Sequence, residues 1–94
     1  MFTISKTFTR PSVDIAWWQD TAEAVQFRTL YTNVNIEQSS DGLSFTGTLT
    51  YENEAQYLEF LANPNAKTSI DQRVVYNTTY GIIEGSTSAR TIQL

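Results

Sequence analysis

Residues 2–9 alternate between large side chains on one face and hydroxyl side chains on the other. Phe2, Ile4 and Phe8 share the first face with Lys6, and every intervening position is Thr or Ser. A period of two with β-branched residues predicts a strand with one buried face. Pro11 marks its end, because proline has no amide hydrogen to donate to a sheet.

Residues 33–51 carry two further alternating segments and predict an antiparallel hairpin. Val34 and Ile36 alternate with polar residues in the first segment. The second segment has apolar side chains on one face, namely Leu43, Phe45, Leu49 and Tyr51, with Gly47 interrupting the row. Its other face carries the hydroxyl side chains of Ser44, Thr46, Thr48 and Thr50. The connecting Asp41-Gly42 pair suits a turn with positive φ.

Two helices are predicted from their start signals. Asp20 and Glu23 have capping-box spacing and predict a helix over about 21–31. Asn53 is a natural cap for a second helix, which the Asn-Pro-Asn sequence at 63–65 ends.

Residues 69–80 give conflicting signals. Their Val-Val-Tyr and Thr-Thr-Tyr runs have strand composition, whereas Ser69 to Gln72 is a capping box and Gly81 stands where a glycine ends a helix. Two matched end signals outweigh a propensity difference of about tenths of a kcal/mol per residue, so a helix is predicted. A last strand begins at residues 82–84, and pairing is expected to resume over 91–94.

The predicted order is therefore β-α-β-β-α-α-β, in a single domain spanning residues 1–94. This is an α+β fold of the ferredoxin-like type, in which a four-stranded antiparallel sheet carries its helices on one face. The other face of the sheet would present the Thr and Ser rows.

The element order, with a broken second helix ending in Tyr76-Asn77 and then Gly81-Ile82, resembles the dimeric α/β-barrel families. These include cofactor-free monooxygenases of the antibiotic-biosynthesis type and stress-responsive barrel proteins. The resemblance implies a homodimer. In the monooxygenases an Asn and a Trp one helical turn apart hold substrate or haem; Asn53 and Tyr57 have that spacing, with Tyr in place of Trp. The segment Phe8 to Pro11, the Trp pair and Gly81-Ile82 also resemble small proteins of marine bacteriophages, which would imply a phage or environmental origin.

Composition excludes much familiar chemistry. The chain has no His and no Cys, which removes the usual general base, thiolate nucleophile and zinc ligands. The haem-degrading branch of the resembled families uses a histidine and is therefore not expected. We predict no catalytic residue, no metal site and no cofactor.

Net charge is −4 and the six cations are scattered, so no nucleic-acid partner and no membrane partner are expected. The N-terminus alternates instead of forming an apolar signal region, which predicts a cytoplasmic or virion location and no secretion.

Two features could serve a site or an interface. Lys6 falls among core residues, where it would act as a base or anion anchor; the favoured interpretation is that its stem covers the sheet rim while its ammonium stays hydrated. Trp17 and Trp18 would point about 100° apart on a helical turn, so one of them is a candidate interface anchor. Packing of both on a loop over the sheet is equally compatible with the sequence.

Our leading hypothesis is a self-associating protein with a structural or protein-interaction role. The alternative is a cofactor-independent monooxygenase-like or small-molecule-binding protein, with ligand contacts from Lys6, Asn53, Tyr57 and Tyr76. A closed, apolar-walled cavity of about a few hundred Å³ between helices and sheet would favour the alternative.

Overall fold

The computed structural model describes residues 1–19 and 33–91. Within them the elements follow in this order: β1 (Phe2–Thr9), β2 (Asn33–Gln38), β3 (Ser44–Tyr51), α2 (Glu54–Ala62), α3 (Pro64–Tyr80), β4 (Ile83–Glu84) and β5 (Ser88–Thr91). The helix predicted over 21–31 and the end of the last predicted strand, 92–94, lie outside the described residues.

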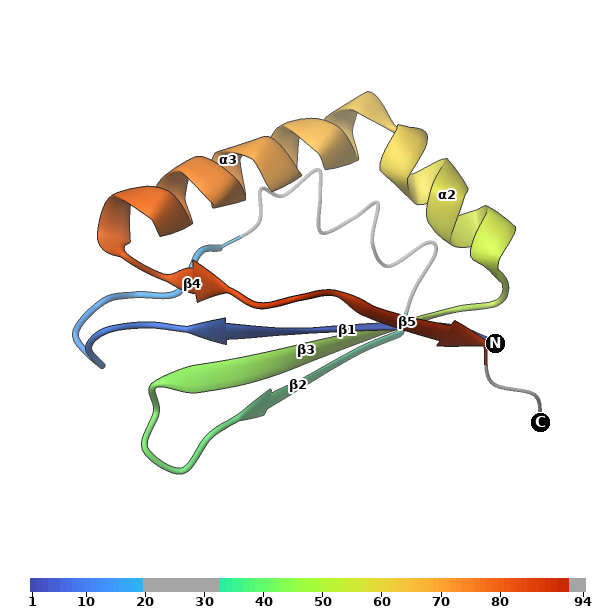
Figure 1. Ribbon diagram of the computed structural model, residues 1–94. Helices are drawn as coiled ribbons and strands as arrows, with labels where there is room; N and C mark the ends of the chain where they lie inside the picture. Colours follow the sequence, from blue (N-terminus) through green and yellow to red (C-terminus); the bar gives the residue numbers. More distant parts are fainter. Residues whose placement is uncertain (20–32, 92–94) are drawn as a thin grey trace.

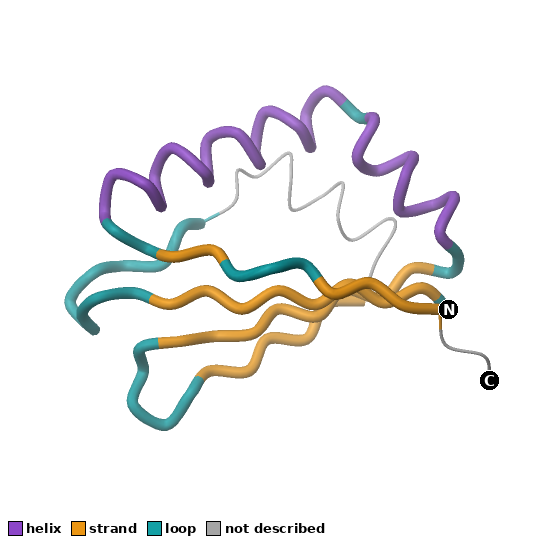
Figure 2. Tube along the Cα trace, in the orientation of Figure 1, coloured by secondary structure: helices purple, strands orange, loops and turns teal. Residues whose placement is uncertain are grey.

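The sheet is antiparallel throughout, with β2 paired to β3 and β3 paired to β1. The other edge of β1 pairs with β4 near Phe8 and with β5 near Phe2, so two short strands share the fourth position. Both α2 and α3 lie over the same face of this sheet, as Figures 1 and 2 show. The predicted α+β fold, with an antiparallel sheet and helices on one face, is confirmed.

The register confirms the two faces predicted for β1 and β3. Each apolar position of β1 lies opposite an odd-numbered β3 position on the helix side of the sheet. On the other side the hydroxyls pair across the strands: Ser5 with Thr48 at 3.2 Å, Thr7 with Thr46 at 2.8 Å and Thr9 with Ser44 at 3.2 Å. We call these six side chains the hydroxyl face.

One asparagine connects the two helices. Asn63 ends α2, and its Oδ1 accepts hydrogen bonds from the backbone N–H of Asn65 at 2.9 Å and of Ala66 at 3.4 Å, at the start of α3. With Pro64 in the first turn, α3 begins earlier than predicted. Ser69 therefore lies inside the helix and does not cap it.

The helix predicted over 69–80 is confirmed. It ends at Gly81, whose φ of 73° gives the left-handed conformation expected of a terminal glycine. Pairing after β4 resumes at Ser88, earlier in the chain than predicted.

The buried core lies where α2 meets the sheet. Phe2, Ile4 and Tyr51 are its buried members, and Tyr57 of α2 packs against them. The Tyr57 ring lies 5.4 Å from that of Phe2 and 5.1 Å from that of Tyr51, measured between centroids. These contacts fix α2 on the sheet.

Candidate functional site

A cavity of about 270 Å³ lies between the sheet and the helices. The sheet contributes a floor from neighbouring strands, and the helices contribute Tyr57 and the sheet-facing side of α3. Its floor includes Lys6, Phe8, Phe45 and Gly47; its α3 wall includes Ser69, Ile70, Arg73 and Asn77. Most of the full lining is apolar or aromatic, and a few polar side chains are set among these groups, which is typical of a small-molecule site.

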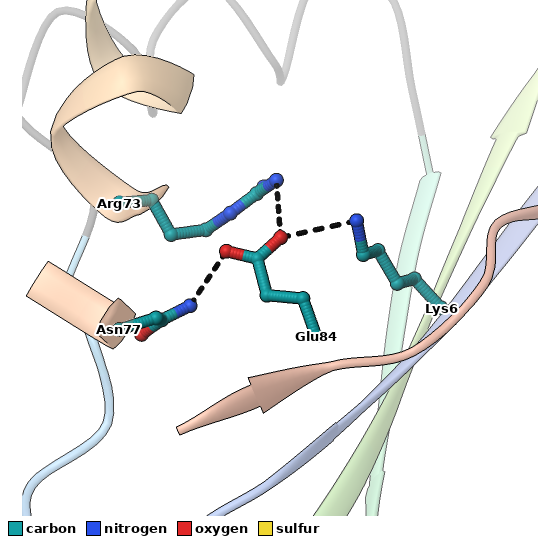
Figure 3. Close-up of polar contacts among 4 residues, drawn as sticks. All are labelled: Lys6, Arg73, Asn77 and Glu84. Carbon is teal, nitrogen blue, oxygen red and sulfur yellow. Dashed lines mark hydrogen bonds and ion pairs between the residues drawn. The ribbon is translucent and has the colours of Figure 1, made fainter. Parts of the chain in front are cut away.

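Three of the polar side chains that line the cavity meet on Glu84. Lys6 Nζ lies 3.0 Å and the Arg73 guanidinium 3.2 Å from Glu84 Oε1, while Asn77 Nδ2 donates to Oε2 at 2.9 Å. Figure 3 shows the carboxylate of β4 between Lys6 of β1 and the two α3 side chains. We call Lys6, Arg73, Asn77 and Glu84 the Glu84 cluster.

The cluster carries one more positive than negative charge. Burial raises the pKa of Glu84, but the hydrogen bonds from Asn77 and Lys6 and the charges of Arg73 and Lys6 outweigh it and hold that pKa below its usual value. Glu84 is therefore ionised near neutral pH. The net charge of +1 lies within a chain of net charge −4, so this end of the cavity favours an anion.

Aromatic rings stand beside the two cations. Lys6 Nζ lies 5.8 Å and Arg73 Cζ 5.4 Å from the centroid of the Phe8 ring. Phe8 in turn stacks on Phe45, with their centroids 4.8 Å apart. The cationic groups thus adjoin flat apolar surface, an arrangement that suits a ligand with an aromatic body and a negatively charged oxygen.

Buried hydrogen-bonding atoms also occur in side chains that line the cavity. Trp18 Nε1, Ser69 Oγ and Arg73 Nε have no hydrogen-bond partner among the described residues. Buried polar groups are normally paired, and leaving one unpaired costs about 1–3 kcal/mol. A ligand with acceptor oxygens would lower that cost.

Both tryptophans line the cavity. Trp17 packs edge-on against Phe45 with centroids 4.7 Å apart, and Trp18 lies 5.5 Å from the ring of Tyr76. The expectation that the two rings diverge assumed a helical turn, but residues 16–19 do not form one. The interface role of Trp17 and Trp18 stays a prediction.

The structure brings together two of the four ligand contacts predicted from sequence. Lys6 and Tyr57 line the cavity, whereas Asn53 and Tyr76 lie outside its wall. The side chain of Asn53 caps α2 by accepting from the backbone N–H of Gln56 at 2.8 Å. The hydroxyl of Tyr76 donates to the carbonyl of Ala16 at 2.7 Å.

Sequence reasoning missed Arg73, Asn77 and Glu84. A usable signal existed, since Arg73 and Asn77 are four residues apart in a predicted helix and share one of its faces. The favoured interpretation of Lys6, a hydrated ammonium at the rim, needs correction: its side chain is 26% exposed and its ammonium pairs with Glu84.

The fold of the chain is that of two solved oxygenase-type proteins. One is a Deinococcus radiodurans protein assigned as an antibiotic biosynthesis monooxygenase, with a TM-score of 0.63 and 14% identity over 100% of this chain and 94% of that one. The other is SnoaB of Streptomyces nogalater, a cofactor-independent oxygenase, with a TM-score of 0.60 and 12% identity over 99% and 93%. The chain has the ferredoxin-like α/β-barrel fold.

The sequence itself matches no family profile and no curated protein. Neither structural neighbour supports the likeness to bacteriophage proteins or a virion location. In the described part of the chain, no helix is long and apolar enough to cross a membrane.

The hypothesis of a structural or protein-interaction role is wrong. Both neighbours are described as oxygenases, and a largely apolar, partly open cavity lies between the helices and the sheet. The alternative is therefore the better supported of the two.

Proposed function

We propose that this chain binds a small aromatic molecule in its cavity and promotes its oxidation by molecular oxygen without a cofactor. The observation that carries the proposal is an aromatic cavity of about 270 Å³ whose wall includes Lys6, Arg73 and Asn77, the three side chains that contact Glu84. A cavity of about 150 Å³ holds benzene, and drug-sized ligands occupy about 300 Å³ or more. The volume therefore suits a ligand of one or two rings.

The chemistry follows from the electronic state of oxygen. Ground-state O₂ has two unpaired electrons and accepts electrons one at a time, so without a cofactor the substrate must be the donor. A phenolate or enolate donates more readily than its neutral acid. Groups that favour the anion inside the cavity therefore promote the reaction.

Lys6 and Arg73 are the proposed anion-stabilising residues. An ammonium has three donors and a guanidinium five, and Glu84 receives one contact from each. Within residues 1–19 and 33–91 neither group makes a further hydrogen bond, so the remaining donors are available to a substrate oxygen. Glu84 is a positioning residue, because it holds the two cations without itself being required to touch the substrate. Asn77 is a positioning residue one step further away, because it donates to the other carboxylate oxygen of Glu84.

A balanced example is the oxidation of 1-naphthol. The hydroxyl proton leaves to solvent, the phenolate transfers an electron to O₂, and the carbon opposite the hydroxyl forms a bond to oxygen. Loss of water gives 1,4-naphthoquinone, so that C₁₀H₈O + O₂ becomes C₁₀H₆O₂ + H₂O. One oxygen atom enters the product and the other leaves as water, with all electrons supplied by the substrate.

The test is oxygen uptake with 1-naphthol as the substrate. We expect one O₂ consumed per 1,4-naphthoquinone formed, and rates lower by at least about tenfold in Lys6→Met and Arg73→Gln. Lys67→Met is the matched control, since it removes an exposed cation of α3 that lies outside the cavity wall. Uptake no faster than in buffer, or equal losses in Lys6→Met and Lys67→Met, would overturn the proposal.

We further propose that two copies associate through the hydroxyl face. Support comes from the position of this face, on the side of the sheet away from α2 and α3, and from its paired rows of uncharged hydroxyls, which Glu37 of β2 and Arg90 of β5 flank. The cytoplasm remains the proposed location. Sedimentation equilibrium at micromolar concentration tests the association, and a strict monomer would rule it out.

A further inference from the structure

Gly47 occupies the middle of β3 on the face toward the cavity. It pairs with Lys6 of β1 on one side and Ile36 of β2 on the other. The neighbouring positions on the same face of β3 are large, namely Phe45 and Leu49. A glycine at this place interrupts an otherwise regular row of bulky side chains.

The backbone does not require glycine here. Gly47 is not among the glycines with positive φ, which are Gly42 and Gly81 in the described residues. A Cβ built on Gly47 would lie 3.8 Å from Phe45 Cε2, an ordinary contact, and it meets no closer atom of the described residues. At Gly85, by contrast, a Cβ would lie 2.9 Å from the carbonyl oxygen of Thr7, so glycine is required there.

A glycine inside a strand is unfavourable, because it loses more backbone entropy on folding and has no side chain to pack. At Gly47 no conformational need offsets this loss. The missing side chain leaves space instead, and Gly47 lines the cavity beside Lys6. We infer that Gly47 is a specificity-determining residue, which keeps the floor open for the second ring of a flat two-ring aromatic ligand.

This inference rests on the proposed function, because it assumes that the cavity binds an aromatic ligand. It goes further by specifying the size and shape of that ligand. One ring would lie against Phe8 and Phe45, and the second would lie over Gly47. Any side chain at residue 47 would occupy the second ring's place and leave the first ring's place free.

The experiment measures binding without oxygen, from the quenching of tryptophan fluorescence by phenol and by 1-naphthol. Gly47→Ala should weaken 1-naphthol binding on the order of tenfold, as one misplaced methyl group does in an apolar pocket, and Gly47→Val should weaken it more. Phenol affinity should change less than twofold in both, by the same reasoning. Thr48→Val, the next residue on the opposite face, is the control and should leave both affinities unchanged.

The melting temperature shows whether glycine at residue 47 serves the ligand or is needed by the fold. If glycine serves only the ligand, Gly47→Ala should raise the melting temperature by a few degrees, since it removes backbone entropy from the unfolded chain. A lower melting temperature, equal losses of phenol and 1-naphthol binding, or no loss of either would each overturn the inference.

The two proposals fail in different ways. If 1-naphthol binds wild type and is weakened by Gly47→Ala but is not oxidised in air, the inference stands and the oxygenase proposal falls. If 1-naphthol is oxidised at equal rates by wild type and Gly47→Val, the inference falls and the oxygenase proposal stands. Absence of 1-naphthol binding to wild type overturns the inference outright.

Discussion

Replacing Glu84 by glutamine tests the electrostatic account of the site. The amide keeps the shape of the side chain but removes the charge that holds Lys6 and Arg73 together. An exposed ion pair contributes about 0–1 kcal/mol, whereas removing one partner of a fully buried pair costs about 3–5 kcal/mol. The side chains of Lys6, Arg73 and Glu84 are 26%, 27% and 16% exposed, between these limits.

We therefore expect Glu84→Gln to lower the free energy of unfolding by about 2 kcal/mol. In a domain of this size that corresponds to a melting temperature lower by roughly 10 °C. The assay is thermal unfolding followed by circular dichroism at neutral pH. Glu52→Gln is the control, because it removes an exposed acid that lies outside the Glu84 cluster.

The pH dependence gives a second check with a definite sign. In the folded chain the pKa of Glu84 lies below the value of about 4.3 expected in the unfolded chain. The contribution of ionised Glu84 to stability is therefore complete above a pH of about 4.3 and is lost as the pH falls through the folded pKa. The stability gap between wild type and Glu84→Gln should therefore be constant from neutral pH down to about 5 and shrink below about 4. Equal stability at neutral pH, or a gap that persists in acid, would refute this reasoning.

Two further predictions concern the helix ends. Asn63→Ala removes the oxygen that accepts from two N–H groups of α3. The free energy of unfolding, measured in urea, should fall by about 1–2 kcal/mol. Recovery of most of this loss in Asn63→Asp would show that the cap is responsible. Gly81→Ala places a residue with a Cβ at a backbone φ of 73°. The free energy of unfolding should fall by about 1 kcal/mol. An unchanged free energy of unfolding would mean that the helix end relaxes without strain.

The strands and α3 could be predicted because their signals are local. The alternation over 2–9 fixes which face of β1 is buried, and the glycine at 81 fixes where α3 ends, whatever the rest of the chain does. The start of α3 was misplaced because two cap signals competed. Asn63 with Pro64 prevailed over Ser69, which continues the helix instead of starting it.

The Glu84 cluster could not be predicted in the same way, because its members come from opposite ends of the chain. Lys6 lies on the first strand and Glu84 on a two-residue strand whose pairing with β1 is set by the tertiary fold. Asn53 shows the converse case. Its side chain accepts from a local backbone donor, and Asn53 is not among the described residues that line the cavity.

Because the cavity adjoins a small core, the stability of the folded chain would depend on the concentration of a ligand bound there. Within the described residues Phe2, Ile4 and Tyr51 form the buried cluster, so a molecule filling the adjacent space would extend the apolar interior. At a free concentration one hundred times its Kd, such a molecule would add about 2.7 kcal/mol to the stability of the native state. If the proposed ligand binds, the abundance of this protein in a cell would rise and fall with the supply of that ligand.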